Sequence, residues 1–584
     1  MQGTWMYKAQ RMLLALLTCL CSTTLFAQIN VNVEIKGIDK HLEDNVRLFL
    51  SIEQQKGHAL ISEGRLRRLH QKAPQEIAKA LQPYGFYRPV IDAVLSQPTP
   101  DSWLVSYSID PGPPLPVAKF DFALSEDMSD DPAFASLVET LPMNQGAVFN
   151  HLSYENIKAS LAKLAAERGY FDARFDKHRV EIDLKEYEAR IQLHYDGGSR
   201  YRFGEVLLQQ DVLAPELLQR YIPFEIGSPY TLNQLIELQQ ALNDSDYFRT
   251  VEVSPGEPQP ESSEIPITVM LTPRNRHRYT LGLGYGTDTG ARAKFGWERP
   301  RLNQRGHRFN TELKVSQIGY SLSAYYRVPV LNPRTDQLVY SAGVVNEKTN
   351  TSDSTVRTIG TSLNRSRGPW RESVSLNYQQ EEFVVADDRG NSILLMPGVN
   401  WSRTWGGKFI RTFDGLRFDI SLRGASKKLV SDTDFLQVQG GIKAITPLGQ
   451  RDRIIARGRL GGTITDEFHQ LPSSVRFFAG GSQSVRGFAY QSLGPVDDSG
   501  NVVGGKHLMS GSIEFEHSLN GKWGLAVFYD GGNAIDNISD KLERGTGLGL
   551  RWQSPVGPVR IDVATAVSDP DHPWRLHINI GPDL

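Results

Sequence analysis

Over the second half of the chain, apolar and polar side chains alternate with a period of two in short segments. The segment YTLGLGYG places Leu281 and Leu283 on one face and Gly282 and Gly284 on the other. GTGLGLRW and VRIDVA, farther along the chain, alternate in the same way. This period is typical of β-strands that have one apolar and one polar face. About sixteen such segments follow one another, and the pattern therefore predicts an all-β, sixteen-stranded antiparallel region over residues 275–584.

The first half of the chain has a different pattern, in which helical and strand-like segments repeat. Apolar residues three and four positions apart, such as those around Leu161, predict helices. Each helix ends in a short aromatic turn and leads into a strand, as in EIAKALQPYGFYRPVIDAVL, NIKASLAKLAAERGYFDARFDKHRV and QLIELQQALNDSDYFRTVEV. Phe86, Phe171 and Phe248 of these turns are 85 and 77 residues apart, which is the size of a small domain.

Residues 1–27 have the pattern of a secretory signal peptide. Two basic residues precede an apolar run from Met12 to Ala27, and cleavage after Ala27 is expected. Both cysteines of the chain, Cys19 and Cys21, lie in this run. We therefore expect an exported protein whose mature form has no disulfide and no thiol chemistry.

Composition narrows the function classes. The charges balance, with 64 Lys and Arg residues against 66 Asp and Glu residues, so no general basic field favours nucleic acid. Beyond residue 27, no apolar run is long enough for a membrane-spanning helix. A soluble sandwich also shows alternating strands, but it does not need strands of about ten residues throughout such a long exported region. The pattern therefore favours a 16-stranded transmembrane β-barrel in an outer membrane.

One long loop interrupts the alternating strands. If the repeats lie in the periplasm, odd-numbered strands run outward, and the loop 466–507 after the eleventh strand is extracellular. It contains Arg486 in the stretch GGSQSVRGFAY. The alternation of the next two strands turns Glu514, Glu516 and Asp530 toward the barrel interior. A loop folded into the barrel could seat the Arg486 guanidinium against these carboxylates with bidentate geometry, whereas a solvated surface arginine is the simpler alternative.

The repeats resemble a known domain. A unit of about 80 residues whose second helix ends in Gly-Tyr-Phe before a strand is similar to a polypeptide-transport-associated (POTRA) domain. This resemblance implies three tandem POTRA domains with β-α-α-β-β topology, at residues 28–115, 116–199 and 200–274. In that family the domains lie in the periplasm and present sheet edges to passing polypeptides.

The long loop carries a second resemblance. Val485, Arg486, Gly487 and Phe488 match, letter for letter, a loop motif of the outer-membrane assembly superfamily that includes BamA, in which the loop inserts into its own barrel. Two of the inward-facing carboxylates, Glu514 within SIEF and Asp530 within FYDGG, fall where that superfamily keeps partners of the arginine. The resemblance therefore implies that Glu514 and Asp530 pair with Arg486, and Glu516 is less favoured. Three POTRA domains and a sixteen-stranded barrel most resemble the TamA family, the outer-membrane subunit of the translocation and assembly module.

The first and last strands predict a weak seam. The first strand is rich in glycine, and the last strand, WRLHINIGPDL, ends in Gly-Pro, which weakens pairing because proline has no N–H. A barrel must close to satisfy its backbone groups, so a weak seam is a place where it can open. The residues predicted to form this seam are Gly282, Gly284, Ile578, Ile580, Gly581 and Pro582.

The resemblance implies an insertase or assembly factor for autotransporter-type outer-membrane proteins, with a link to phospholipid transport. Its implied partners are unfolded client proteins, outer-membrane lipids and an inner-membrane-anchored, TamB-like protein that bridges the periplasm. A polypeptide-export pore of the two-partner-secretion type and a passive porin are the alternatives.

No motif predicts an enzyme. The near match GNVVGGKH to a phosphate-binding loop lacks the Ser or Thr that would bind magnesium, and the histidines show no metal-ligand spacing. We therefore expect no catalytic residues, no metal site and no cofactor.

Overall fold

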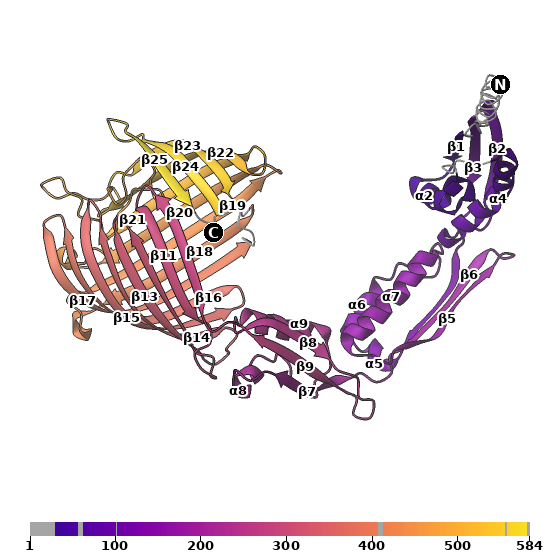
Figure 1. Cartoon of the computed structure of the whole chain (residues 1–584), viewed down its shortest axis with the longest axis horizontal. Coiled ribbons are helices and arrows are strands. Elements are labelled where there is room, and N and C mark those ends of the chain that lie inside the picture. The colour runs from indigo at the N-terminus through magenta and orange to yellow at the C-terminus, as the bar shows by residue number, and fades with distance from the viewer. Residues whose placement is uncertain (1–29, 56–61, 101, 407–412, 555–556, 581–584) are drawn as a thin grey trace, which may run out of the picture. The chain divides into compact units, whose positions relative to one another are not determined.

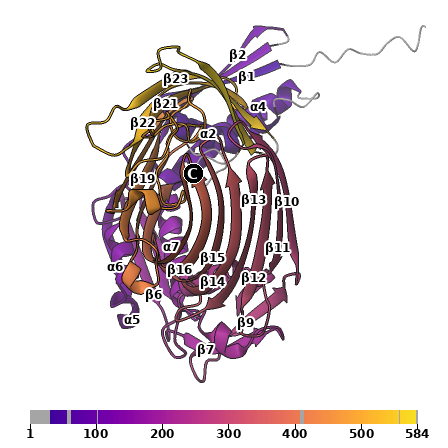
Figure 2. The same ribbon diagram turned by 90° about the vertical axis from the view of Figure 1, so that its left-hand side faces the viewer.

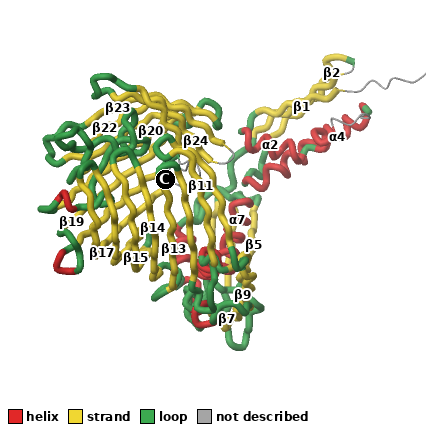
Figure 3. The backbone as a smooth tube through the Cα atoms, turned by 60° about the vertical axis from the view of Figure 1, so that its left-hand side comes forward, coloured by secondary structure: helices red, strands yellow, loops and turns green. Residues whose placement is uncertain are grey.

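The computed structural model describes most of the chain in four sheets, three small ones and one of sixteen strands. The expected signal peptide lies outside the described residues, which are 30–55, 62–100, 102–406, 413–554 and 557–580. Figure 3 shows the division between the helix-containing repeats and the wall of strands. The chain divides into two compact units, each described here by itself.

The first two repeats share one topology. In each, the first strand pairs parallel to the third, and the second strand pairs antiparallel to the third. The first repeat consists of β1 (Asn30–Lys36), α2 (Lys40–Phe49), α3 (Ser51–Gln55), α4 (Glu63–Leu81), β2 (Val90–Thr99) and β3 (Ser102–Asp110). The second consists of β4 (Val117–Leu124), α5 (Glu126–Ser129), α6 (Pro132–Glu139), α7 (His151–Arg168), β5 (Arg174–Asp183) and β6 (Glu188–Asp196).

These two repeats contain one more helix than the expected β-α-α-β-β order. The additional helices, α3 and α5, are only five and four residues long, and so lack the sustained periodicity that reveals a helix in a sequence. The third repeat has two helices, as expected. It consists of β7 (Arg202–Gln209), α8 (Pro215–Gln219), α9 (Leu232–Asp244), β8 (Phe248–Pro255) and β9 (Glu264–Pro273). Among the described residues, no helix combines the length and the hydrophobicity needed to cross a membrane.

The Gly-Tyr-Phe turn of the second repeat has a structural cause. Gly169 ends α7 in the left-handed conformation, with φ of +87°. A Cβ atom there would lie 2.9 Å from the Cβ of Tyr230, so only glycine fits without displacement. Tyr170 is buried in the core of the repeat, as expected for the turn, whereas Phe171 packs edge-on against Tyr201 and Tyr230.

The remaining sixteen strands form one sheet in sequence order, in which every neighbouring pair is antiparallel (Figures 1 and 2). This confirms the expected sixteen-stranded barrel. Its strands are β10 (Arg278–Gly286), β11 (Gly290–Arg299), β12 (Arg308–Ser316), β13 (Gly319–Pro329), β14 (Asp336–Lys348), β15 (Ser352–Arg367), β16 (Trp370–Val385), β17 (Asp388–Gly406), β18 (Gly415–Ala425), β19 (Phe435–Leu448), β20 (Asp452–Ile464), β21 (His507–Ser518), β22 (Trp523–Ile535), β23 (Glu543–Ser554), β24 (Gly557–Ala566) and β25 (Trp574–Ile580).

The middle strands of the barrel are longer than the ten residues that the alternation predicts. β15 and β16 have 16 residues each, and β17 has 19. Their additional residues include polar runs such as QQEE in β16. A strand needs about ten residues to cross the hydrocarbon core, so these strands continue beyond it.

The segments that follow α8 and α9 of the third repeat contact the barrel at two turns. The Tyr247 hydroxyl donates to the carbonyl of Gly306, between β11 and β12, at 2.6 Å. The Tyr221 hydroxyl donates to the carbonyl of Pro333, between β13 and β14, at 3.3 Å. Both turns follow even-numbered strands of the barrel, because β11 and β13 are its second and fourth strands. The contacts therefore agree with the expected orientation, in which these turns face the periplasm.

Asp131 of the second repeat is a buried carboxylate that is surrounded by hydrogen-bond donors and positive charges. It accepts hydrogen bonds from the Ala133 N–H at the start of α6 and from Nε and Nη2 of Arg168. Nη1 of Arg200 lies 3.3 Å from its Oδ2. Burial alone would raise the pKa of Asp131, but the bonds from Arg168 and Ala133 and the charges of Arg168 and Arg200 lower it below its ordinary value.

We predict that Asp131→Asn lowers the free energy of local unfolding around α6 by about 1–3 kcal/mol at pH 7. A lowered folded-state pKa gives stability that is present above the unfolded pKa of about 3.9 and is lost as the pH falls through the folded value. The difference between the native protein and the variant should therefore shrink below about pH 4. Hydrogen exchange of α6 as a function of pH measures this, and a pH-independent difference would contradict it.

Candidate functional site

The segment between β20 and β21 folds over the barrel interior. Three isolated bridges hold it in shape, and they join Phe477 to Gly505, Ala479 to Leu493 and Val496 to Val502. Val485 is fully buried in a small apolar cluster with Ala479 and Leu493, against which Phe488 packs. We call residues 465–506 the lid loop.

A buried arginine braces the base of the lid loop. The Arg476 guanidinium donates to the carbonyls of Leu471, Val503 and His469, at 2.8, 3.0 and 2.9 Å. It also forms an ion pair with Asp388, the first residue of β17, at 2.8 Å. One side chain thus ties two ends of the loop to a barrel strand.

Arg486 is the second buried arginine of the lid loop, and only 2% of it is exposed. Its Nε and Nη2 donate to the two oxygens of Asp530 at 2.7 and 2.9 Å, which is bidentate pairing. Its Nη1 donates to Glu514 at 2.7 Å and to Asp562 at 3.0 Å. The guanidinium also lies over the ring of Phe528, 3.3 Å from its centroid. The structure therefore brings Arg486 together with both expected carboxylates and adds a third.

Glu516, the less favoured candidate, does not contact Arg486. It pairs instead with Arg453 and Arg551, at 2.5 and 2.9 Å. Arg551 also binds Glu514 and Asp562, so the carboxylates around Arg486 form one continuous buried network. Each of these charges is matched by an opposite one, which a charge in a low-dielectric interior requires.

Two glycines let the lid loop approach the wall closely. Gly487 has φ of +99°, and a Cβ atom there would lie 2.8 Å from the backbone nitrogen of Ala566. A Cβ atom on Gly545 would lie 1.9 Å from the carbonyl oxygen of Arg486. The motif glycine and this wall glycine therefore allow a contact between two backbones.

The first and last strands of the barrel share no ladder among the residues described. Two hydrogen bonds connect them and their neighbours: the Ile578 N–H donates to the Thr287 hydroxyl at 3.3 Å, and Arg292 donates to the Ile580 carbonyl at 3.4 Å. The Leu283 side chain on β10 is 81% exposed on the outer, apolar face of the barrel.

The predicted seam residues divide into two groups. Gly282 and Gly284 lie on β10, and Ile578 and Ile580 lie at the end of β25. An added Cβ on Gly284 would lie 3.0 Å from Nε of Arg292, so the glycine leaves room for this arginine to reach the last strand. The expected roles of Gly581 and Pro582 lie outside the described residues.

The lid loop also contacts both sides of the seam. Ser482 donates to Asp288, in the turn after β10, through its N–H at 2.8 Å and its hydroxyl at 2.7 Å. The Gly487 N–H donates to Nε2 of His577 on β25, at 3.1 Å. The loop is thus hydrogen-bonded to the first hairpin and to the last strand.

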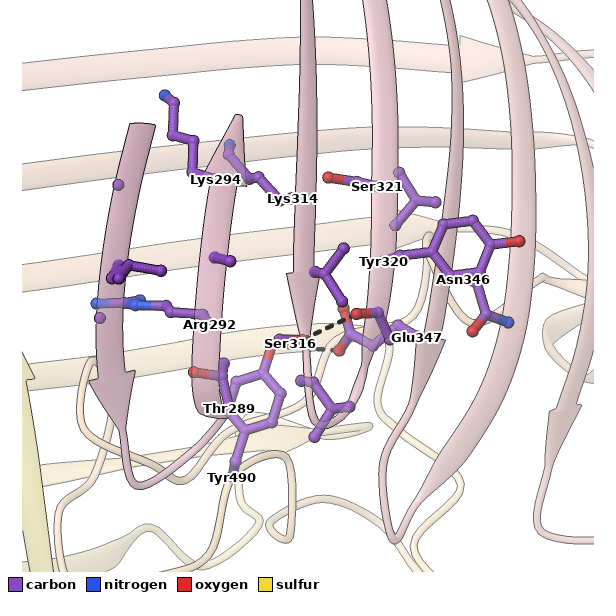
Figure 4. Close-up of a pocket in the computed structure, with 18 of the residues that line it drawn as sticks. Thr289, Arg292, Lys294, Lys314, Ser316, Tyr320, Ser321, Asn346, Glu347 and Tyr490 are labelled. Carbon is purple, nitrogen blue, oxygen red and sulfur yellow. Dashed lines mark hydrogen bonds between the residues drawn. The ribbon is translucent and has the colours of Figure 1, made fainter. Parts of the chain in front are cut away.

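A cavity of about 500 Å³ lies beside the seam, between the first barrel strands and the lid loop. Arg292, Lys294 and Lys314 line it from neighbouring strands, and Tyr490 lines it from the lid loop (Figure 4). Ile580 of the last strand also reaches it. Burial raises the pKa of Tyr490 to about 12, and its hydroxyl donates to Glu347, a carboxylate that also lines the cavity, at 3.4 Å. The edge of β10 therefore borders a partly basic space inside the barrel.

Sequence reasoning missed four residues of this site. Asp562 could have been found, because the alternation in VRIDVA turns it toward the same side as the other carboxylates. Asp288, His577 and Arg476 could not, because their partners are distant in sequence and no pattern marks them. Among the described residues, no group of three or more acidic or histidine side chains could hold a metal ion.

The fold and the buried loop define a class of protein, a transmembrane barrel that is preceded by POTRA-type domains and filled in part by its own loop. The Omp85 superfamily domain matches residues 277–583. The chain therefore belongs to the Omp85 superfamily, whose barrels lie in the outer membrane with their POTRA domains in the periplasm. In addition, the first POTRA domain of TamA matches residues 32–111.

Curated relatives and a solved structure agree with this membership. The chain is 25% identical over 185 residues to the outer membrane protein assembly factor BamA of Nitratidesulfovibrio vulgaris, a match that spans 30% of this chain and 23% of the relative. It is 21% identical over 536 residues to BamA of Neorickettsia risticii, spanning 84% of this chain and 69% of the relative. The structure of Haemophilus ducreyi BamA lacking POTRA domains 1–3 aligns with a TM-score of 0.68 at 17% identity, covering 80% of this chain and 99% of that one, and it supports the fold.

We predict that Arg486→Ala detaches the lid loop, because the substitution leaves three carboxylates without the charge that they surround. Loss of one partner of a buried ion pair costs about 3–5 kcal/mol. Val485 is buried in the loop, so a Val485→Cys probe becomes accessible when the loop detaches. Labelling of this cysteine by a membrane-impermeant maleimide measures the detachment. Labelling should rise at least tenfold in Arg486→Ala and less in Arg486→Lys, which keeps the charge but not the bidentate geometry.

Lys294→Ala is the matched control, because Lys294 faces the lumen but pairs with Glu312 rather than with the lid loop. Unchanged labelling in Arg486→Ala would show that the other contacts of the loop suffice to hold it.

Proposed function

We propose that the protein inserts or assembles outer-membrane proteins, without covalent chemistry, through the seam between β10 and β25. The observation that carries this proposal is the edge of β10, which shares no ladder with β25 among the described residues. The hydrogen bonds from Ile578 to Thr287 and from Arg292 to Ile580 link the two ends of the sheet there. The two BamA relatives are named as assembly factors, which supports the same role here.

The physical obstacle to insertion is the cost of unpaired backbone groups in hydrocarbon. Each unsatisfied N–H or C=O group costs several kcal/mol there, so a client strand needs partners before it enters. An open edge offers such partners by strand addition. Within the described part of the seam, two hydrogen bonds have to break before β10 can pair with a client.

We further propose that the protein is the barrel subunit of a translocation and assembly module, with autotransporter-type proteins as clients. The match of the first repeat to the first POTRA domain of TamA supports this assignment. The partner would be a TamB-like protein that spans the periplasm, and outer-membrane lipids would be further partners through a link to phospholipid transport. The first repeat has a free sheet edge at β2, where Val90 and Val94 are exposed, and this edge suits a β-structured partner.

A cysteine pair across the seam tests the insertase proposal. The full sequence has two cysteines, both in the expected signal peptide, so an introduced pair has no competitors. Thr287→Cys and Ile578→Cys place the thiols where the two strands already touch. We predict that oxidation in outer membranes stops insertion of an autotransporter barrel, and that reductant restores it.

The two single-cysteine variants are the controls, and both should insert clients with and without oxidant. Full insertion by a protein that is shown to be cross-linked would exclude lateral opening. Export of a polypeptide through the lumen, in the manner of two-partner secretion, would then be the better hypothesis. A passive porin would be favoured by a separate result, ion conductance that persists when the lid loop is cross-linked to the barrel wall.

A further inference from the structure

Basic side chains form a row across neighbouring barrel strands in the range β18 to β21. Arg417 pairs with Lys443, Lys443 pairs with Arg457, and Arg457 pairs with Ser512. Ser512 is two residues from Glu514, which faces the interior, so the row lies on the interior wall. Arg459 extends the positive charge into the adjacent row.

This arrangement is electrostatically unfavourable by itself. Like charges directly opposite each other on neighbouring strands destabilise a sheet. Within the described part of the chain, no carboxylate lies within ion-pair distance of Arg417, Lys443, Arg457 or Arg459. In contrast, the arginines of the neighbouring network are matched by carboxylates at 2.5–3.0 Å.

The row lines a cavity of about 290 Å³. Gly441 leaves part of its wall without a side chain, and Gln483 and Ser484 of the lid loop reach it from the other side. Asp419 is the single carboxylate among the lining residues, against four cations. The groups that converge on the space are therefore mainly hydrogen-bond donors.

Arg457 shows that the donors are not used up within the protein. Its Nη2 donates to the Ser512 hydroxyl at 3.0 Å, but its buried Nε has no partner among the described residues. A buried donor without an acceptor is costly, and such a group usually marks a missing water, ion or ligand. Ser512 also accepts a bond from Arg486, so this space adjoins the anchor of the lid loop.

We propose that this cavity is a binding site for a phosphate-class oxyanion, held between the barrel wall and the lid loop. A single carboxylate would neutralise one of the four cations, whereas a phosphate or pyrophosphate carries more charge and can accept bonds from several donors at once. The anion would relieve the repulsion along the row and accept from Nε of Arg457. It would also touch the tip of the lid loop, so its binding stabilises the docked loop. This site is independent of the proposed insertase function.

Calorimetric titration of the full-length protein in detergent with inorganic pyrophosphate, at low ionic strength, tests the proposal. We expect binding of one anion. Arg459→Gln, an exposed substitution that spares the buried network, should weaken it about tenfold. Asp419→Asn should have the opposite effect and tighten pyrophosphate binding, because it removes a negative charge that repels the anion. Lys294→Gln, at the other basic cavity, should leave the affinity unchanged.

The source of the anion requires a second measurement. In nanodiscs, phosphatidylglycerol should compete with pyrophosphate if the natural occupant is a lipid headgroup. If the occupant is a soluble phosphate, the affinity for pyrophosphate should be the same in phosphatidylcholine and in phosphatidylglycerol nanodiscs. Absence of pyrophosphate binding, or equal affinities in Arg459→Gln, Asp419→Asn and the native protein, would overturn the proposal. So would tighter binding of an acidic peptide than of pyrophosphate, because the site would then fit an acidic chain.

Discussion

The structure of the site depends on the burial of one positive charge. A guanidinium removed from water is tolerated only where anions surround it, and Arg486 meets this requirement with three carboxylates on three different strands. The requirement acts in both directions, because the carboxylates are as costly without the arginine as the arginine is without them. The lid loop therefore has one favourable position, and the interior wall is built around it.

The contacts of the lid loop are unevenly distributed around the barrel. Its buried ion pairs lie on β17, β21, β22 and β24, whereas its link to the first hairpin is the pair of hydrogen bonds that the neutral Ser482 donates to Asp288. The ion pairs of the two buried arginines thus hold the loop to strands outside the first hairpin, whereas the bonds to the first hairpin come from a neutral donor. Movement of β10 away from β25 costs little of the energy that holds the loop in place.

Much of the fold could be predicted from the sequence, because strand periodicity and the repeat of Phe86, Phe171 and Phe248 are local signals. The sixteen strands follow from alternation, as does the inward direction of Glu514, Glu516 and Asp530. The choice of Glu514 and Asp530 as partners of Arg486 came from the resemblance of the loop motif. The short helices α3 and α5 could not be predicted, because they are too short to show a sustained period. The length of β17 could not be predicted either, because the strand continues past the membrane. Contacts such as Arg476 with Asp388 depend on how distant segments meet, which alternation does not encode.

The bridge from Ser482 to Asp288 also has a consequence for how the chain folds. These residues are 194 positions apart, whereas Arg486 is 28 to 76 positions from its carboxylates. Contacts that close larger loops form later on average, because the chain entropy lost before they form is greater. The loop can therefore settle onto the carboxyl-terminal strands while the amino-terminal hairpin is still free. Among the contacts of the lid loop, the one that reaches the first hairpin is therefore expected to form last, together with the seam that it crosses.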